Sequence, residues 1–186
     1  MHRLFIAIDL PASVKATLRS ICHGVEGARW VSDAQMHLTL KFVGAADDSL
    51  LSRIANALAG IRQPEFPMAV CGVGCFPGER EARVIWAGLK APPALAVLQK
   101  EIDAVLAREG IPPENRPFSP HVTLARIKVP NPREISRFRS RNESFAIAEF
   151  TIREFHLYSS VLSPKGPTYT KERSYPLLTT AGPDTP

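Results

Sequence analysis

The 186-residue sequence contains only three cysteines and no Cys-x-x-Cys pair. An odd number of cysteines without that spacing supports neither a disulfide framework nor a zinc site, so we expect reduced thiols. No apolar run approaches the roughly 20 residues that a bilayer-spanning helix needs. The N-terminal segment reaches a carboxylate at Asp9, too early for the apolar part of a secretory signal. These absences predict a cytoplasmic protein without a membrane segment.

The composition is that of an ordinary globular protein, with 45% hydrophobic and 22% charged residues. A chain of this length fits one domain or two small lobes that share an interface. No stretch resembles an inter-domain linker, so we expect a single two-lobed domain over residues 1–178 and a disordered tail over 179–186. The excess of 23 Lys and Arg over 18 Asp and Glu modestly favours a polyanionic partner, although charge alone does not identify one.

Hydrophobic periodicity predicts an α+β fold with mainly antiparallel strands. A Pro-Gly turn between two apolar runs predicts a hairpin within residues 66–89. Two-residue alternation predicts further strands over 4–10, 36–44, 120–127, 145–162 and 166–178. Helical spacing predicts helices over 11–27, 47–61, 92–110 and 132–141.

The most informative feature is a His-x-Thr-Leu motif that occurs twice, at residues 37–40 and 121–124. Residues i and i+2 of a strand point the same way, so each motif places an imidazole beside a hydroxyl while the intervening residue faces the core. The repeat suggests two similar lobes that arose by duplication. If the two strands face each other across a cleft, two imidazoles and two hydroxyls converge on one small volume.

Paired imidazoles suit acid–base chemistry, because one ring can accept a proton near neutral pH while the other donates one. In-line cleavage of a phosphodiester requires such a pair. A single strand-borne His-x-Thr is more typical of a structural hydrogen bond, but two copies on polar strand faces favour catalysis. His37 and His121 could instead be metal ligands. No Asp, Glu or Cys has a companion spacing, however, and threonine is a poor ligand for transition metals.

Six segments of the chain, taken in order, resemble the RNA 2′,3′-cyclic phosphodiesterase branch of the two-histidine phosphoesterases, also called 2′-5′ RNA ligase-like proteins. These segments are residues 5–9, Trp30 with 37–44, 72–77, 83–86, 120–126 and 166–169. The resemblance covers nearly the whole chain. It implies a bilobal α+β fold in which two pseudo-symmetric lobes, with mainly antiparallel sheets and helices on the outside, flank a central cleft.

The resemblance also implies hydrolysis of RNA 2′,3′-cyclic phosphate ends, or small cyclic nucleotides, to 2′-phosphomonoesters without a metal or other cofactor. His121 would act as the base on water, and His37 would be the proton donor to the departing 3′ oxygen. Thr39 and Thr123 would hydrogen-bond the non-bridging oxygens, and Arg126 would hold the phosphate. The reverse reaction would form 2′-5′ linkages. We expect a monomer with no obligate protein partner.

Several alternatives stay open. Strict alternation puts Arg126 on the Val122 face, where it would pack beside the core or pair with a carboxylate, unless a bulge after Thr123 redirects it. Alternation places Lys41 on the His37 face, but a strand lysine is more often solvated, so we do not assign it to the site. Aromatic side chains such as Phe5 could stack a base or belong to the core; Tyr158 and Tyr169 share this ambiguity. The competing functions are a non-catalytic RNA-binding or nucleotide-binding module and a phosphodiesterase for other small cyclic phosphates.

Overall fold

The computed structural model describes residues 2–90, 92–163 and 166–179. Within these ranges the chain forms nine strands, four α-helices and two short 3-10 turns. The strands are β1 (His2–Asp9), β2 (Ala28–Trp30), β3 (His37–Ala46), β4 (Phe66–Phe76), β5 (Val84–Lys90), β6 (His121–Ile127), β7 (Ala146–Ile152), β8 (Glu154–Ser163) and β9 (Gly166–Pro176). The helices are α1 (Ala12–Ser20), α2 (Asp48–Leu58), α3 (Pro93–Arg108) and α4 (Pro132–Arg141), and the 3-10 turns are η1 (Asp33–Gln35) and η2 (Glu79–Glu81).

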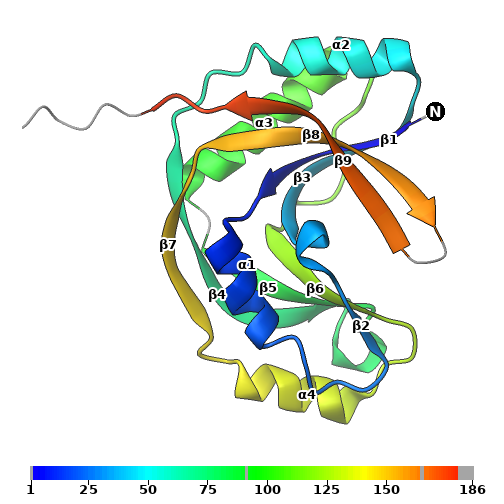
Figure 1. The fold of residues 1–186 in the computed structure, drawn as a ribbon, viewed down its shortest axis with the longest axis vertical. Coiled ribbons are helices and arrows are strands. Elements are labelled where there is room, and N and C mark those ends of the chain that lie inside the picture. The colour runs from blue at the N-terminus through cyan, green and yellow to red at the C-terminus, as the bar shows by residue number, and fades with distance from the viewer. Residues whose placement is uncertain (1, 91, 164–165, 180–186) are drawn as a thin grey trace, which may run out of the picture.

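All nine strands belong to one curled sheet in the order β7-β4-β5-β6-β3-β1-β8-β9, with β2 paired to β6 (Figure 1). The paired strands run antiparallel. Helices α2 and α3 lie at one end of the molecule and α4 lies at the other (Figure 1). The predicted α+β class is confirmed, and the two predicted sheets are halves of this continuous sheet.

The two halves of the sheet meet between β3 and β6, the strands that carry the two motifs. A single residue pair, Leu38 opposite Val122, joins these strands. Both side chains are buried, with 1% and 0% of their surface exposed, and they belong to one apolar cluster that runs through both halves. The junction is therefore held by core packing more than by a long ladder of hydrogen bonds.

The helices form where apolar spacing and capping residues predict them. The Asp47 carboxylate accepts a hydrogen bond from the Leu50 backbone N–H at 2.7 Å and caps α2. The stripe of α3 buries Leu95, Leu98, Ile102 and Leu106. Both helices thus contribute one apolar face to the shared core.

Helix α1 is shorter than predicted, because it ends at Ser20 and not near Gly27. Beyond the helix, Gly24 and Gly27 adopt φ values of 79° and 71°, in the left-handed region that an α-helix does not contain. Val25 nevertheless packs into the core from this loop, with 6% of its surface exposed. Its burial explains why the apolar spacing continued beyond the helix.

The predicted position of Lys41 on the His37 face is wrong. In the β1–β3 register, Ile6 pairs with Lys41 and Ala7 pairs with Thr39, so Leu40 is an extra residue without a partner on β1. This bulge reverses the alternation beyond it. Lys41 is 2% exposed in the core, whereas Phe42 is 64% exposed. Lys41 Nζ lies 3.0 Å from Asp103 Oδ1 of α3 and donates to the Pro112 carbonyl at 2.8 Å.

Three predictions concern the ends, the membrane and the thiols. Of the predicted disordered tail, residues 180–186 lie outside the described part of the chain. No described helix is long and apolar enough to cross a membrane. Cys22, Cys71 and Cys75 are free cysteines in this structure.

Candidate functional site

The register between β3 and β6 brings the two His-x-Thr motifs together. Because Leu38 faces Val122, the antiparallel register sets His37 beside Thr123 and sets Thr39 beside His121. These four side chains point to the face of the sheet opposite the buried Leu38 and Val122, and all four are half-buried. We call them the His–Thr cluster. Its two imidazoles occupy one diagonal and its two hydroxyls the other, so the predicted juxtaposition is present.

A backbone carbonyl two residues earlier holds each imidazole. The Nδ1 atom of His121 lies 2.8 Å from the Ser119 carbonyl oxygen. A carbonyl only accepts, so Nδ1–H donates and the Nε2 atom of the neutral ring carries a lone pair. The His37 ring has a hydrogen bond with the backbone of Gln35, which raises its pKa. Each motif histidine thus has a backbone partner two residues earlier in the chain.

The His37 ring lies in an aromatic pocket. Its centroid is 5.0 Å from the Phe5 ring and 5.3 Å from the Tyr169 ring, and Tyr158 lies 6.3 Å away. Phe5 and Tyr158 are buried and Tyr169 is half-buried. These three aromatic residues, for which the sequence left base stacking and core packing open, therefore pack against a motif histidine.

Burial in this pocket lowers the pKa of His37 to about 4. Asp9 pairs with His37 across β1 and β3, and the negative charge of its carboxylate raises the pKa of His37 and so opposes this shift. The positive charges of Lys15 and Arg126 lower the pKa further. In the ligand-free protein His37 is therefore neutral at pH 7.

Two aromatic residues that sequence reasoning missed surround His121. The Phe76 ring lies 5.1 Å from the imidazole and the Trp86 ring lies 6.3 Å away. Trp86 pairs with Thr123 across β5 and β6, and its ring lies so close to Gly74 that a Cβ atom there would overlap it. Gly74, a glycine within a strand, was the one sequence signal for the position of Trp86, and it can be interpreted only once the strand pairing is known.

Arg126 shares the face of the His–Thr cluster. The β5–β6 register passes from Trp86 opposite Thr123 to Ile85 opposite Ala125, which leaves Leu124 as an extra residue. This is the bulge required for Arg126 to turn toward His121. Arg126 is exposed, and its positive charge contributes to the lowered pKa of His37. It also opposes the rise that burial causes in the pKa of Tyr169.

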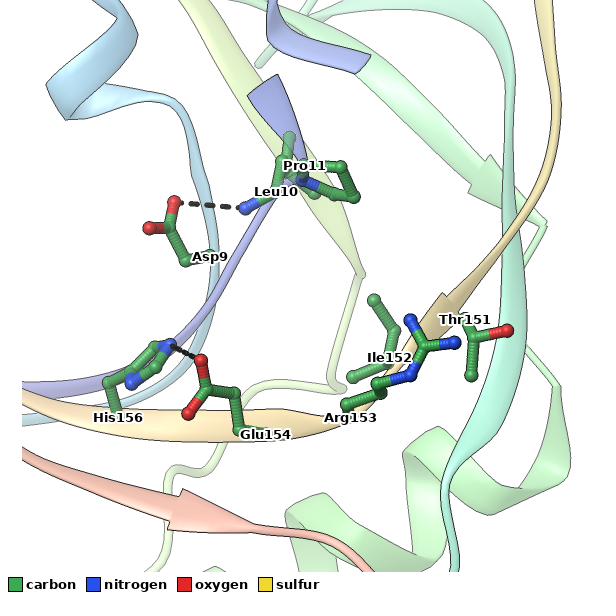
Figure 2. A pocket seen from close by; sticks show the side chains of 8 residues that line it. All are labelled: Asp9, Leu10, Pro11, Thr151, Ile152, Arg153, Glu154 and His156. Atoms are coloured by element: carbon green, nitrogen blue, oxygen red, sulfur yellow. Dashed lines mark hydrogen bonds and ion pairs between the residues drawn. The ribbon is translucent and has the colours of Figure 1, made fainter. Parts of the chain in front are cut away.

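A separate hollow of about 210 Å³ lies at the end of β1, beside β7 and β8 (Figure 2). Its lining residues are Asp9, Leu10, Pro11, Thr151, Ile152, Arg153, Glu154 and His156. None of the predicted site residues lines it, although its lining residue Asp9 pairs with His37. His156 Nδ1 is 2.9 Å from Ser174 Oγ, and Lys171 Nζ is 3.3 Å from the other ring nitrogen. Burial and then the Lys171 charge lower the pKa of His156, so this ring is neutral at pH 7.

Potential metal ligands are dispersed in the described ranges. No three His, Cys, Asp or Glu side chains there are grouped so that they could hold a metal ion. His37 and His121 are therefore not part of such a group in the described ranges. Metal independence remains a prediction that a chelator experiment tests.

A family comparison adds to this geometry. The model of the LigT like phosphoesterase family matches residues 8–86 and residues 89–169. Each matched segment contains one His-x-Thr-Leu motif. The chain belongs to this family. The predicted membership in the two-histidine phosphoesterases is therefore confirmed.

Similar LigT-like phosphoesterases match over nearly their whole length. The RNA 2′,3′-cyclic phosphodiesterase of Archaeoglobus fulgidus is 32% identical over 176 residues, covering 93% of this chain and 99% of the relative. The protein of that name from Escherichia coli is 32% identical over 185 residues, covering 95% and 97%. The crystal structure of TT0787 of Thermus thermophilus has a TM-score of 0.77 and 31% identity, covering 94% and 97%. The structure of E. coli LigT complexed with 3′-AMP has a TM-score of 0.75 and 29% identity, covering 95% and 98%.

Proposed function

We propose that this LigT-like phosphoesterase is an RNA 2′,3′-cyclic phosphodiesterase that converts cyclic phosphate ends to 2′-phosphomonoesters. The observation that carries the proposal is the pairing of Leu38 with Val122, which sets two imidazoles and two hydroxyls on one face. The names of the relatives from A. fulgidus and E. coli support the same substrate class.

We assign the role of base to His121. Its Nδ1–H is held by the Ser119 carbonyl, which leaves Nε2 to take a proton from the attacking water. The water oxygen then bonds to phosphorus while the bond from phosphorus to the 3′ oxygen breaks. His37, on the opposite diagonal corner, donates a proton to that departing oxygen. The nucleotide retains the phosphate on its 2′ oxygen.

The acid role of His37 requires the substrate to change its protonation. The free ring is neutral at pH 7, since burial lowers its pKa to about 4. A bound phosphate carries negative charge, and an anion beside an imidazole raises the imidazole pKa. Substrate binding thus prepares His37 as a proton donor at the moment when a donor is needed.

The remaining polar groups stabilise charge on the phosphate. Thr39 and Thr123 lie beside the imidazoles and can donate hydrogen bonds to the two non-bridging oxygens. Arg126 faces the same side and supplies a fixed positive charge. Small 2′,3′-cyclic nucleotides would fit the same groups, and the reverse reaction would join RNA ends through 2′-5′ linkages.

We further propose that the protein acts as a monomer in the cytoplasm and needs no cofactor. Three free thiols fit a reducing compartment. Sedimentation equilibrium of the purified chain tests this proposal, and a monomer predicts a single species of 20.4 kDa.

Phosphorus NMR tests the proposed reaction directly. The protein is incubated in excess EDTA with uridine 2′,3′-cyclic phosphate, and uridine 2′-monophosphate is the expected product. A 3′-monophosphate would mean that the other ester bond is cleaved. If the wild-type protein gives no turnover but still binds uridine 2′-monophosphate, the chain is a non-catalytic nucleotide-binding module.

A further inference from the structure

Two arginines stand directly opposite each other next to the His–Thr cluster. Strand β2 pairs with β6 so that Arg29 faces Arg126, between the pairs Ala28–Ile127 and Trp30–Ala125. Directly opposite residues of an antiparallel pair point to the same face, with Cβ atoms about 5 Å apart. Arg29 therefore shares the face of Arg126.

The burial pattern supports this orientation of Arg29. Its neighbours Ala28 and Trp30 pack against the core, and the Trp30 ring lies 5.6 Å from Phe138 of α4. Arg29 itself is exposed, as is Arg126. The two side chains consequently project together from the face that carries the His–Thr cluster.

The Arg29 guanidinium reaches across to the start of β9. A Cβ atom built on Gly166 would lie 3.2 Å from Arg29 Nη2. The Gln35 amide donates a hydrogen bond to the Pro167 carbonyl at 3.2 Å, which ties η1 to the same strand. Tyr169, two residues further along β9, feels the charge of Arg126 and packs against His37. Arg29 thus borders the same surface as the groups around His37.

The strand arrangement places Arg29 further along β6 than the His–Thr cluster, at the position of the phosphate next to the reactive one. Strands β3 and β2 follow each other along one edge of β6, because β5 occupies the other edge. Arg126 lies three positions after Thr123 along β6, which is about 10 Å at roughly 3.3 Å per residue. Flexible arginine side chains can shorten this separation, so a phosphate adjoining the reactive one lies within reach of Arg29.

Arg29 and Arg126 place two positive charges side by side on this face. The guanidinium fork matches phosphate oxygens. We propose that Arg29 binds the internucleotide phosphate on the 5′ side of the terminal cyclic phosphate, and so makes the enzyme favour RNA ends over mononucleotides. This inference rests on the proposed function for the position of the reactive phosphate.

The experiment compares the affinities of wild type and Arg29→Gln for three ligands, one of which lacks the charge on the internucleotide phosphate. The ligands are uridine 2′-monophosphate and the dinucleotide ApU with a 2′-phosphate, and the counterpart is the same dinucleotide with a methylphosphonate linkage. We expect Arg29→Gln to weaken binding of the phosphodiester dinucleotide about tenfold. Binding of the mononucleotide and of the methylphosphonate should change less than twofold. The slope of log affinity against log salt for the dinucleotide should fall by about 0.7.

Arg108→Gln is the matched control, because it removes the same charge from an exposed position at the end of α3. It should leave all three affinities unchanged. Equal losses on the mononucleotide and the dinucleotide, or on the phosphodiester and the methylphosphonate, would overturn the proposal. Parallel turnover assays on the corresponding 2′,3′-cyclic substrates separate the two hypotheses. If the wild-type protein does not hydrolyse these substrates but Arg29→Gln still loses affinity only for the phosphodiester dinucleotide, the proposed enzymatic activity is refuted. The proposed phosphate subsite at Arg29 would then stand.

Discussion

Leu38 and Val122 face each other as the one residue pair that joins β3 to β6. Both side chains are buried, so the position of this pair is set by the core. A shift of one residue would move one motif to the opposite face of the sheet. Packing of two aliphatic side chains therefore decides whether His37 and His121 meet.

The first prediction concerns the titration of His37. In the free protein its ring should become protonated only as the pH falls toward about 4, because burial disfavours the charged form. Bound uridine 2′-monophosphate should raise this midpoint, since phosphate stabilises the imidazolium. Histidine ring signals followed by NMR, assigned with His37→Asn, measure both values. A free-state midpoint near 6.5, or no upward shift with ligand, would contradict the account.

Asp9 should keep the pKa of His37 higher than burial alone would allow. The Asp9 carboxylate opposes the effect of burial, and its nearest charged partner is Lys15 at 2.6 Å. Asp9→Asn removes the negative charge and leaves Lys15, so the NMR midpoint of His37 should move further down. Glu109→Gln, which breaks a distant ion pair with Arg53, is the control and should leave it in place. An unchanged midpoint in Asp9→Asn would show that the two groups do not interact.

Lys41 should matter for stability and not for catalysis. Its buried ammonium pairs with Asp103, so Lys41→Met leaves that carboxylate without its cation and should cost about 3 kcal/mol of unfolding free energy. Urea unfolding measures the loss. The matched variant Lys100→Met, at an exposed position of α3, should stay within about 0.5 kcal/mol of wild type. Wild-type stability combined with a large drop in kcat for Lys41→Met would place Lys41 in the site instead.

Arg126 should contribute to phosphate binding without stabilising the fold. Its side chain is exposed and turned toward the His–Thr cluster by the Leu124 bulge. Arg126→Gln should weaken binding of uridine 2′-monophosphate about tenfold, the value of one charge-assisted hydrogen bond. The melting temperature should stay the same. Calorimetry against Arg108→Gln tests this, and unaltered affinity would remove Arg126 from the site.

Much of the fold followed from alternation along single strands. The motif residues face as predicted, because no bulge interrupts β3 or β6 between His and Thr. Capping by Asp47 and the apolar stripe of α3 likewise have local causes. The family resemblance depended on such local segments, which explains why it could be recognised from the sequence.

The features that sequence reasoning missed depend on pairing between distant segments. The bulge at Leu40 is defined only by the register with β1, and it turned Lys41 away from the face that alternation predicts. The lowered pKa of His37 arises where β1, β8 and β9 bring aromatic rings against it. Strand β2 has three residues, too few to show a period. Arg29 could therefore not be connected to Arg126 before the fold was known.

The most direct test of the central claim is kcat for uridine 2′,3′-cyclic phosphate in His37→Asn, His121→Asn and the double variant, measured in EDTA. Each single change should lower kcat by about 10²–10⁴-fold, and the double change should cost little more, because the two imidazoles serve one reaction as a unit. Near wild-type turnover in either single variant would contradict the account, as would losses that multiply in the double variant.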